Sequence, residues 1–356
     1  MARPDTRRRL PRPSELATMT DRRFFRCLLE QGPMSRAAIA QATGISKPTI
    51  SESAQRLLAQ SLIVETSRRT QGHQGRSGVL YDINAERGHS LGIALESGRL
   101  QARALDLKAG EVWRHEVPLA TAGSPDDLVA LVHKMIALGR EQTGTELLSL
   151  GFSVADPVDP KTGEVVPLPD SPFPVGHDLN LLKDFDTAGY PVTLDNDVNW
   201  ATLAEKALGC ARDADDFLYV YLGQGIGAGL YQSGRLQRGN EGLAGEIGYV
   251  QTPDGETLLS LTNRQAGQPW DDLTLTSVGH AIAMATVLLN PALVVLGGPR
   301  VDASDAFNRL KAVIEARTPR PVSIEPSGMR SDGPLVGVSI GAHQAALRHL
   351  GMTEPA

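Results

Sequence analysis

The segment TLDNDVNW at residues 193–200 decides the fold, together with FLYVYLGQGIGAG at 217–229 and AGEIGY at 244–249. The first predicts a strand that ends at Asn196-Asp197 and a helix that begins there, where an amide and a carboxylate can bind hydroxyl groups. The second predicts two apolar strands around a glycine turn, which lets the backbone approach a ligand closely. Taken singly, such features are more often a helix cap and a hairpin turn, so the inference depends on their order and spacing.

In this order and spacing the three segments resemble the ROK family (repressors, open-reading-frame proteins and sugar kinases) of the actin-like ATPase superfamily. The resemblance implies an α/β fold, namely a two-lobed domain of the actin-like ATPase (ribonuclease H-like) type. It also implies that Asn196 and Asp197 bind a sugar, that Asp197 occupies the position of the kinase base, and that Glu246 is a further sugar ligand. The glycine-rich turn matches the one that holds nucleotide phosphate in the family.

The sequence departs from the family pattern at two places. ALESG at residues 94–98 lies where the family's kinases carry Asp-x-Gly-Gly-Thr. Glu96 would repel a nucleotide phosphate there, so we expect no enzymatic activity and no catalytic residue. Tyr249 replaces the family's His after Glu-Ile-Gly, which makes it a candidate ligand residue, and residues 251–272 contain no Cys or His. Because thiolates and imidazoles are the usual ligands of structural zinc, the sequence predicts no metal and no cofactor.

A helix-turn-helix followed by a hairpin is predicted ahead of this domain. Thr20 is predicted to cap the first helix, and Ser35 and Ser46 the next two. The short Thr43-Gly44-Ile45 connection suits the tight geometry of the motif. Two strands then flank a loop rich in Arg, Gly and Gln, which is typical of a wing. An ordinary helical bundle with a hairpin would explain the apolar faces, but it would not explain the outward polar residues of the third helix.

The same segment resembles the winged helix-turn-helix in front of ROK regulators. A Gly-Arg-Pro wing tip is common in those proteins, and here the tip is Gly75-Arg76-Ser77. We expect the third helix to lie in the major groove of DNA and Arg76 to reach the adjacent minor groove. The candidate DNA-binding residues are Arg36, Ser46, Lys47, Thr49, Ser51, Gln55, Arg68 and Arg76.

Charge separates the two parts of the chain. Residues 1–88 hold 15 Lys and Arg against 8 Asp and Glu, a balance of +7, whereas the remainder holds 20 against 33, a balance of −13. A basic head on an acidic body indicates that only the head meets a polyanion, although a solvated basic arm would give the same count. No apolar run reaches the length of a membrane span, and the start of the chain lacks the apolar core of a signal peptide. We therefore expect a cytoplasmic protein that does not contact a membrane.

The predicted organisation is a disordered basic arm at 1–18, a winged helix-turn-helix domain at 19–87 and a ROK-like sensor domain at 88–356, with lobes at about 88–192 and 193–356. We expect a repressor that binds an inverted-repeat operator in double-stranded DNA as a homodimer or higher homo-oligomer. It would sense a small molecule, a sugar or sugar derivative, without phosphorylating it. Two alternatives stay open: an ATP-dependent sugar kinase with a DNA-binding head, and a ROK-fold regulator that has lost sugar sensing. The Pro-rich segment 156–175 either closes over the sugar or is an ordinary surface loop.

Overall fold

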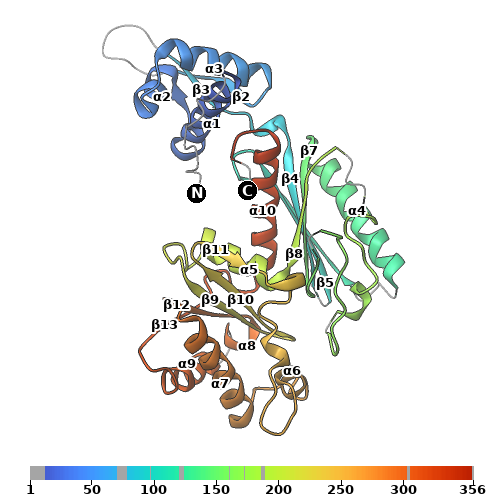
Figure 1. Cartoon of the computed structure of the whole chain (residues 1–356). Helices are drawn as coiled ribbons and strands as arrows, with labels where there is room; N and C mark the ends of the chain where they lie inside the picture. The colour runs from blue at the N-terminus through green and yellow to red at the C-terminus, as the bar shows by residue number, and fades with distance from the viewer. Residues whose placement is uncertain are drawn as a thin grey trace, which may run out of the picture.

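The computed structural model describes residues 13–69, 78–96, 98–119, 124–159, 161–171, 173–185, 189–302 and 305–354. Figure 1 shows three parts in succession: a small helical head, a first lobe built on one sheet, and a second lobe built on another. The C-terminal helix lies beside the first sheet, with one end toward the head and the other toward the second lobe (Figure 1).

The head contains three helices and a small antiparallel sheet of order β1-β3-β2. Its elements are α1 (Pro13–Gln31), β1 (Met34–Ser35), α2 (Arg36–Thr43), α3 (Lys47–Ala59), β2 (Ile63–Arg69) and β3 (Val79–Ile83). Ser35 Oγ accepts a hydrogen bond from the Ala38 N–H at 3.2 Å, and Ser46 caps α3 in the same way. Gly44 adopts φ 69° between the two helices, in the left-handed region that favours glycine. The helix-turn-helix prediction is confirmed at the Ser35 and Ser46 caps and at the Gly44 turn.

The first helix begins earlier than the sequence predicted. It starts at Pro13 rather than at Thr20, so residues 13–18 are helical and do not belong to a disordered arm. Proline suits the first turn of a helix, because the N–H that it lacks has no partner there. The Thr20 hydroxyl donates to the Leu16 carbonyl at 3.0 Å within the helix instead of capping it. The rest of the predicted arm, residues 1–12, lies outside the described residues.

The first lobe is a five-stranded sheet of order β6-β5-β4-β7-β8. Its strands are β4 (His89–Glu96), β5 (Arg99–Asp106), β6 (Glu111–Pro118), β7 (Leu147–Val154) and β8 (Val192–Asn196), and α4 spans Pro125–Thr143. Strands β4, β7 and β8 are parallel, so their carboxyl ends share one edge of the sheet. Leu91 lies against Gly139 of α4, whereas the next residue, Gly92, lies against Ser339 of α10 (Gly333–His349). The two helices therefore cover opposite faces.

The second lobe is a five-stranded sheet of order β11-β10-β9-β12-β13. Its elements include α5 (Asp197–Ala207), β9 (Phe217–Leu222), β10 (Ile226–Gln232), β11 (Arg235–Gln237), α6 (Leu258–Asn263), α7 (Asp272–Leu289), β12 (Leu293–Gly297), α8 (Pro299–Asp302), α9 (Ala306–Glu315) and β13 (Ser323–Pro326). Leu218 and Val220 of β9 pack with α7 and α9, and Phe217 and Tyr219 of the same strand pack with α5. Because side chains alternate along a strand, α5 covers the face opposite α7 and α9.

The C-terminal helix begins six residues before the predicted start at Ser339. The segment from Gly333 was missed because glycines at 333, 337 and 341 lower helix propensity. These glycines serve close packing on α5. A Cβ at Gly337 would lie 1.9 Å from the Trp200 carbonyl, and a Cβ at Gly341 would lie 2.3 Å from the Trp200 ring. Although α10 ends the chain, it packs on the first sheet, so the first lobe includes residues from both sides of the predicted boundary at 193.

The glycine-rich segment 223–229 is only partly a turn. Gly223 and Gly225 form the connection between β9 and β10, but Gly227 and Gly229 lie within β10 and face α5. A Cβ at Gly227 would meet Val198, and a Cβ at Gly229 would meet Thr202. The predicted turn is therefore confined to the first two glycines, and the last two bring α5 close to β10. Gly227 also lines the cavity between the lobes.

By length and composition, helix α7 could span a membrane, and it is the one such helix among the described residues. Its buried residues pack into the core of the second lobe with β9, β12 and α9. This packing is that of a core helix in a globular domain.

Candidate ligand cavity and nucleic-acid interface

A cavity of about 360 Å³ lies between the two lobes, where strands of both sheets end. The first sheet contributes the ends of β4, β7 and β8, and the second contributes the turn after β9. Ligand sites of open α/β sheets lie in this position, beyond the carboxyl ends of the parallel strands. The polar and charged side chains that line the cavity are Glu96, Arg99, Asp156, Ser171, Asn196, Asp197, Tyr221, Gln224, Glu246, Tyr249 and Ser331.

Asn196 and Asp197 lie at the junction of β8 and α5, as predicted. Asn196 Oδ1 accepts a hydrogen bond from the Asn199 N–H at 2.7 Å and so caps α5. This leaves the Asn196 Nδ2 group to donate to a ligand. Asp197 Oδ1 accepts from the Val198 N–H at 2.7 Å. Desolvation, followed by the negative charge of Glu96, raises the pKa of Asp197 to about 8, so the carboxyl group is largely protonated at neutral pH.

Glu246 and Tyr249 approach the cavity from the second lobe. Gly245 adopts φ 98°, and a Cβ there would lie 1.7 Å from the Ala228 carbonyl, so only glycine lets this segment run against β10. Burial, together with the charge of Asp156, raises the pKa of Glu246 to about 7. The Tyr249 hydroxyl donates to the Pro169 carbonyl, and desolvation raises the pKa of Tyr249 to about 12. Tyr249 thereby fastens the Pro-rich segment 156–175 to the cavity wall, which favours the closing role over an ordinary surface loop.

Asp156 lines the cavity and was not singled out from the sequence. Its carboxylate accepts from Ser171 Oγ at 2.7 and 2.8 Å, and the His177 Nε2 atom lies 3.3 Å from Oδ2. Burial raises the pKa of Asp156 despite these contacts. Its position could have been inferred, because it follows the apolar strand 147–154 as Asp197 follows β8, and neighbouring parallel strands end at one edge.

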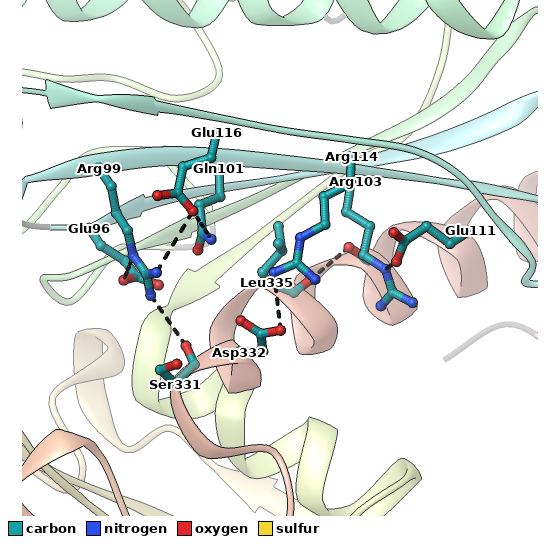
Figure 2. A network of polar contacts seen from close by, with 11 residues as sticks. Glu96, Arg99, Gln101, Arg103, Glu111, Arg114, Glu116, Ser331, Asp332 and Leu335 are labelled. Atoms are coloured by element: carbon teal, nitrogen blue, oxygen red, sulfur yellow. Dashed lines mark hydrogen bonds and ion pairs between the residues drawn. The ribbon is translucent and has the colours of Figure 1, made fainter. Parts of the chain in front are cut away.

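Glu96 and Arg99 form an ion pair at the other side of the cavity. Figure 2 shows the pair within a polar network that joins β4, β5 and β6 to the segment before α10. Arg99 Nε donates to Glu96 Oε2 at 2.8 Å, and Arg99 Nη2 donates to the Ser331 carbonyl at 3.4 Å. Arg114 Nη2 bonds Asp332 Oδ2 at 3.0 Å a short way along the same segment. Burial raises the pKa of Glu96, and Arg99 opposes that shift. The sequence had no signal for the role of Arg99.

A second ion pair ties the segment that carries Glu246 to the start of α5. Arg238 Nε donates to Asp195 Oδ2 at 2.6 Å, and Asp195 Oδ1 accepts from Asn199 Nδ2 at 2.6 Å. Asp195 is 4% exposed. A buried carboxylate with this many donors fixes the backbone that presents Asn196 and Asp197.

On the head, α3 presents a polar face to solvent. Lys47 and Gln55 are exposed, and Thr49 and Ser51 are half-buried. Three of the predicted DNA-binding side chains already form hydrogen bonds within the head. The Ser51 hydroxyl donates to the Lys47 carbonyl at 3.0 Å, and Ser46 Oγ lies 2.8 Å from Thr49 Oγ1. The guanidinium of Arg36 lies 5.8 Å from the centre of the Tyr81 ring and 3.4 Å from Ser51 Oγ. Arg76 and the Arg68 side chain lie outside the described residues.

The structure therefore brings Asn196, Asp197, Glu246 and Tyr249 into one cavity, although the outermost two, Asn196 and Tyr249, are 53 positions apart in the chain. It adds Glu96, Arg99 and Asp156 to them. Although four carboxyl groups line the cavity, the described residues contain no group of three or more His, Cys, Asp or Glu side chains placed to hold a metal ion.

A family model described as the ROK family matches residues 91–268, half of the 356 residues. The chain belongs to the ROK family. It is 28% identical over 241 residues to the xylose repressor of Bacillus subtilis (strain 168), covering 67% of this chain and 61% of that protein. It is 22% identical over 329 residues to the DNA-binding transcriptional dual regulator NagC of Escherichia coli (strain K12), covering 78% and 80% of the two chains.

Kinases of the family are also similar. The beta-glucoside kinase of Listeria innocua serovar 6a is 33% identical over 157 residues, which cover 40% of this chain and 49% of that protein. Among solved structures, a ROK family transcriptional regulator homologous to the E. coli MLC protein has a TM-score of 0.69 at 20% identity, over 95% of this chain and 99% of that one. The ROK hexokinase from Thermus thermophilus has a TM-score of 0.60 at 22% identity, over 72% and 98%. At these identities the structures show the fold alone, which confirms the predicted ROK architecture.

The ROK domain contains a second cavity, of about 740 Å³, on the other side of the glycine turn. Gln224, Ser171 and Pro299 line both cavities, so the two adjoin. Arg300 lies over Trp270 in this second cavity, 5.4 Å from the ring centre, and donates to the Gln265 carbonyl at 3.0 Å. This is the side on which the family resemblance would place a nucleotide.

Proposed function

We propose that this chain is a DNA-binding transcriptional repressor whose ROK domain senses a sugar or sugar derivative without phosphorylating it. The names of the relatives support this function, since they include a xylose repressor and NagC. The chain covers about 61% of the xylose repressor, so that protein's ligand is not carried over. The polar face of α3 supports DNA binding, and the hydroxyl-binding side chains of the interlobe cavity support sugar binding.

One observation carries the proposal: α10 connects the cavity to the head. Ser331 and Pro334, at the start of the helix, line the cavity. At the other end, Ala346, Leu347 and Met352 belong to the same apolar core as Phe24 and Phe25 of α1 (these core residues are all buried). A displacement of the helix at the cavity therefore reaches the head without crossing a flexible linker.

The ligand would act on α10 from two sides. Asn196 and Asp197 begin α5, which packs on α10 through the contact of Trp200 with Gly337 and Gly341. Arg99 holds the Ser331 carbonyl from the first sheet. A ligand that bridges these groups and Glu246 would favour one arrangement of the lobes. It would thereby shift the population of head positions, with a coupling free energy of about 1–3 kcal/mol.

On DNA, the proposed arrangement is a homodimer with inverted half-sites, in which α3 lies in the major groove and the loop with Arg76 reaches the minor groove. Lys47 and Gln55 are exposed on α3, and we expect their side chains to contact the DNA. Two-fold symmetry of the protein would appear as a pseudo-palindromic operator. The protein would work in the cytoplasm, where its operator is.

The competing function is a sugar kinase with a DNA-binding head, and one observation favours it. Asp197 has the raised pKa of a general base, and it lies within reach of a ligand in the cavity. Phosphoryl transfer also requires a metal-nucleotide cradle. Glu96 lies at the end of β4 beside the cavity, and its carboxylate would repel a phosphate there. A repressor that no longer senses sugar is the third possibility.

Selection from a random duplex library with the full chain tests the DNA-binding role, followed by a panel of sugars added to the selected complex. We expect an inverted repeat with half-sites about one helical turn, or a multiple of it, apart. At least one sugar should release the chain from that site. Magnesium-ATP with the same sugars should give no phosphorylated product. Recovery of no preferred sequence would contradict the repressor, and formation of a sugar phosphate would establish the kinase.

A further inference from the structure

We propose that the interlobe cavity takes an unphosphorylated sugar that carries a protonated amine, in preference to the neutral sugar of the same shape. This inference depends on the proposed function, because it names the ligand class of the same cavity. It concerns the charge of the ligand and leaves its stereochemistry open.

More acidic than basic side chains line the cavity. Four carboxyl groups face it from four different elements, namely Glu96, Asp156, Asp197 and Glu246. Arg99 is the one Lys or Arg side chain in the lining among the described residues. The carboxyl groups also act on one another, since the charges of Glu96, Asp156 and Glu246 each raise the pKa of Asp197. A further negative charge is therefore unfavourable in this cavity, whereas a positive charge would favour the ionised form of the carboxyl groups.

Arg99 already interacts with two carboxylates and a backbone carbonyl of the chain (Figure 2). It bonds Glu96 Oε2 at 2.8 Å and the Ser331 carbonyl at 3.4 Å, and its Nη1 lies 3.9 Å from Glu116 Oε2. A phosphate group would have to displace Glu96 from this cation while it faced the other carboxyl groups. Two negative charges that lie close together repel strongly in a partly desolvated site. A phosphorylated sugar is therefore disfavoured.

Two of the carboxyl groups that line the cavity, Glu96 and Asp197, have acceptor capacity that the described residues do not use. Glu96 Oε1 is buried and has no hydrogen-bond partner among the described residues. Asp197 accepts from its neighbour's backbone N–H, and no ion pair with it is found in the described part of the chain. An ammonium group offers three donors and a full charge, and its bonds to carboxylates are stronger than those of a hydroxyl group. A sugar amine would therefore supply both the donors and the charge that this cavity lacks.

Binding of an amine should also change the protonation of Asp197 and Glu246, and this change can be measured separately from affinity. The pKa of Asp197 is raised to about 8 and that of Glu246 to about 7, so both bind protons in the empty cavity at pH 7. An arriving ammonium group favours the charged carboxylates and should expel protons. The other charged or titratable groups that line the cavity are Glu96 and Arg99 from the first sheet, Asp156, Tyr221 from the second sheet, and Tyr249.

Calorimetry with the full chain tests the proposal with matched sets of hexoses of gluco, galacto and manno configuration. Each set contains the parent sugar, its 2-amino-2-deoxy form, the N-acetylated amine and the 6-phosphate. For the set that fits the cavity, we expect the free amine to bind at least tenfold more tightly than the parent or the N-acetyl form at pH 7. Titrations in buffers of different ionisation enthalpy should show net proton release for the amine alone.

Two variants test whether the preference for the amine comes from the charge of Glu246. Glu246→Gln should reduce the ratio of the affinity for the amine to that for the parent sugar to less than threefold. Glu241→Gln, a change of the same kind at an exposed position, should leave the preference unaltered. Equal affinity for the amine and the parent sugar, or tighter binding of the 6-phosphate, would overturn the inference about the ligand. Neither result would contradict the proposed repressor function. Binding of no sugar in any set would count against sugar sensing itself.

Discussion

Arg22 Nε donates a hydrogen bond to the carbonyl oxygen of Gly351 over 2.9 Å, between the first helix of the head and the turn that follows α10. Around this bond the head and the ROK domain share one apolar core, to which Leu148 of β7 and Leu107, directly after β5, also contribute. The head is therefore packed on the ROK domain, and its position depends on that of α10.

Arg22→Ala should weaken the coupling between ligand and DNA more than it weakens the fold. The lost hydrogen bond is half-buried and worth about 1 kcal/mol. We expect DNA affinity without ligand to change little, and the change caused by ligand to shrink at least threefold. Anisotropy titrations on operator DNA give both quantities. Arg23→Ala is the matched control, because it removes the same charge from an exposed neighbouring position. If both variants lost the response to ligand equally, the effect would come from the charge of the head and not from the bond to Gly351.

Gly341→Ala should destabilise the protein, although alanine is about 1 kcal/mol better than glycine in a helix interior. The new Cβ would lie 2.3 Å from the Trp200 ring, in a contact between α10 and α5 that leaves no room. Overpacking of this kind costs about 1–3 kcal/mol, which chemical denaturation measures. The penalty should fall in a Trp200→Leu background, where the ring is absent. If Gly341→Ala raised the stability, the close packing of the two helices would be incorrect.

Arg238→Ala should lower ligand affinity through the backbone that carries Asn196 and Asp197. It leaves Asp195 buried without its cation, which costs about 1–3 kcal/mol for a group that keeps its other donors. We expect a loss of stability together with a rise of Kd for the ligand of about tenfold. Arg235→Ala, at an exposed position of β11, removes the same charge and should change neither. A normal Kd in Arg238→Ala would show that this ion pair does not hold the site.

Asp197→Asn should stabilise the ligand-free protein at pH 8. The pKa of Asp197 is about 8 in the folded chain, above the ordinary value near 3.9 of the unfolded chain. Between these values the folded chain binds more protons, so this group removes stability as the pH rises from about 4 to 8. Because Asp197 is only half-buried, we expect a gain of the order of 1 kcal/mol. Thermal unfolding of both proteins from pH 5 to 8 should show a gap that widens with pH. A constant gap would contradict the raised pKa.

The elements that the sequence predicted best are those marked by local chemistry. Ser35, Ser46 and Gly44 are residues that helix ends require, so α2 and the start of α3 were placed correctly. The junction at Asn196-Asp197 followed from an apolar strand that meets a capping residue. The start of α10 could not be predicted in this way, because Gly337 and Gly341 serve a contact with a helix more than 130 residues earlier.

The candidate site was predicted in part for the same reason. Asn196, Asp197 and Glu246 belong to segments with a family pattern, and the structure brings them to one cavity. Arg99 and Ser331 meet through the packing of α10 on the first sheet, a contact between residues 232 positions apart that no local pattern records. Glu96 was predicted to repel phosphate, but its pairing with Arg99 depends on the register of β4 and β5.

We expect a sugar in the interlobe cavity to change the DNA affinity of the head through α10, without phosphoryl transfer. Fluorescence anisotropy of the selected operator, titrated with the full chain at several sugar concentrations in nucleotide-free buffer with chelator, tests it most directly. We predict that saturating sugar changes the Kd for DNA at least tenfold, about 1.4 kcal/mol, and that magnesium-ATP adds nothing. A Kd that is indifferent to a sugar shown to bind the cavity, or that responds only when ATP is present, would contradict the account.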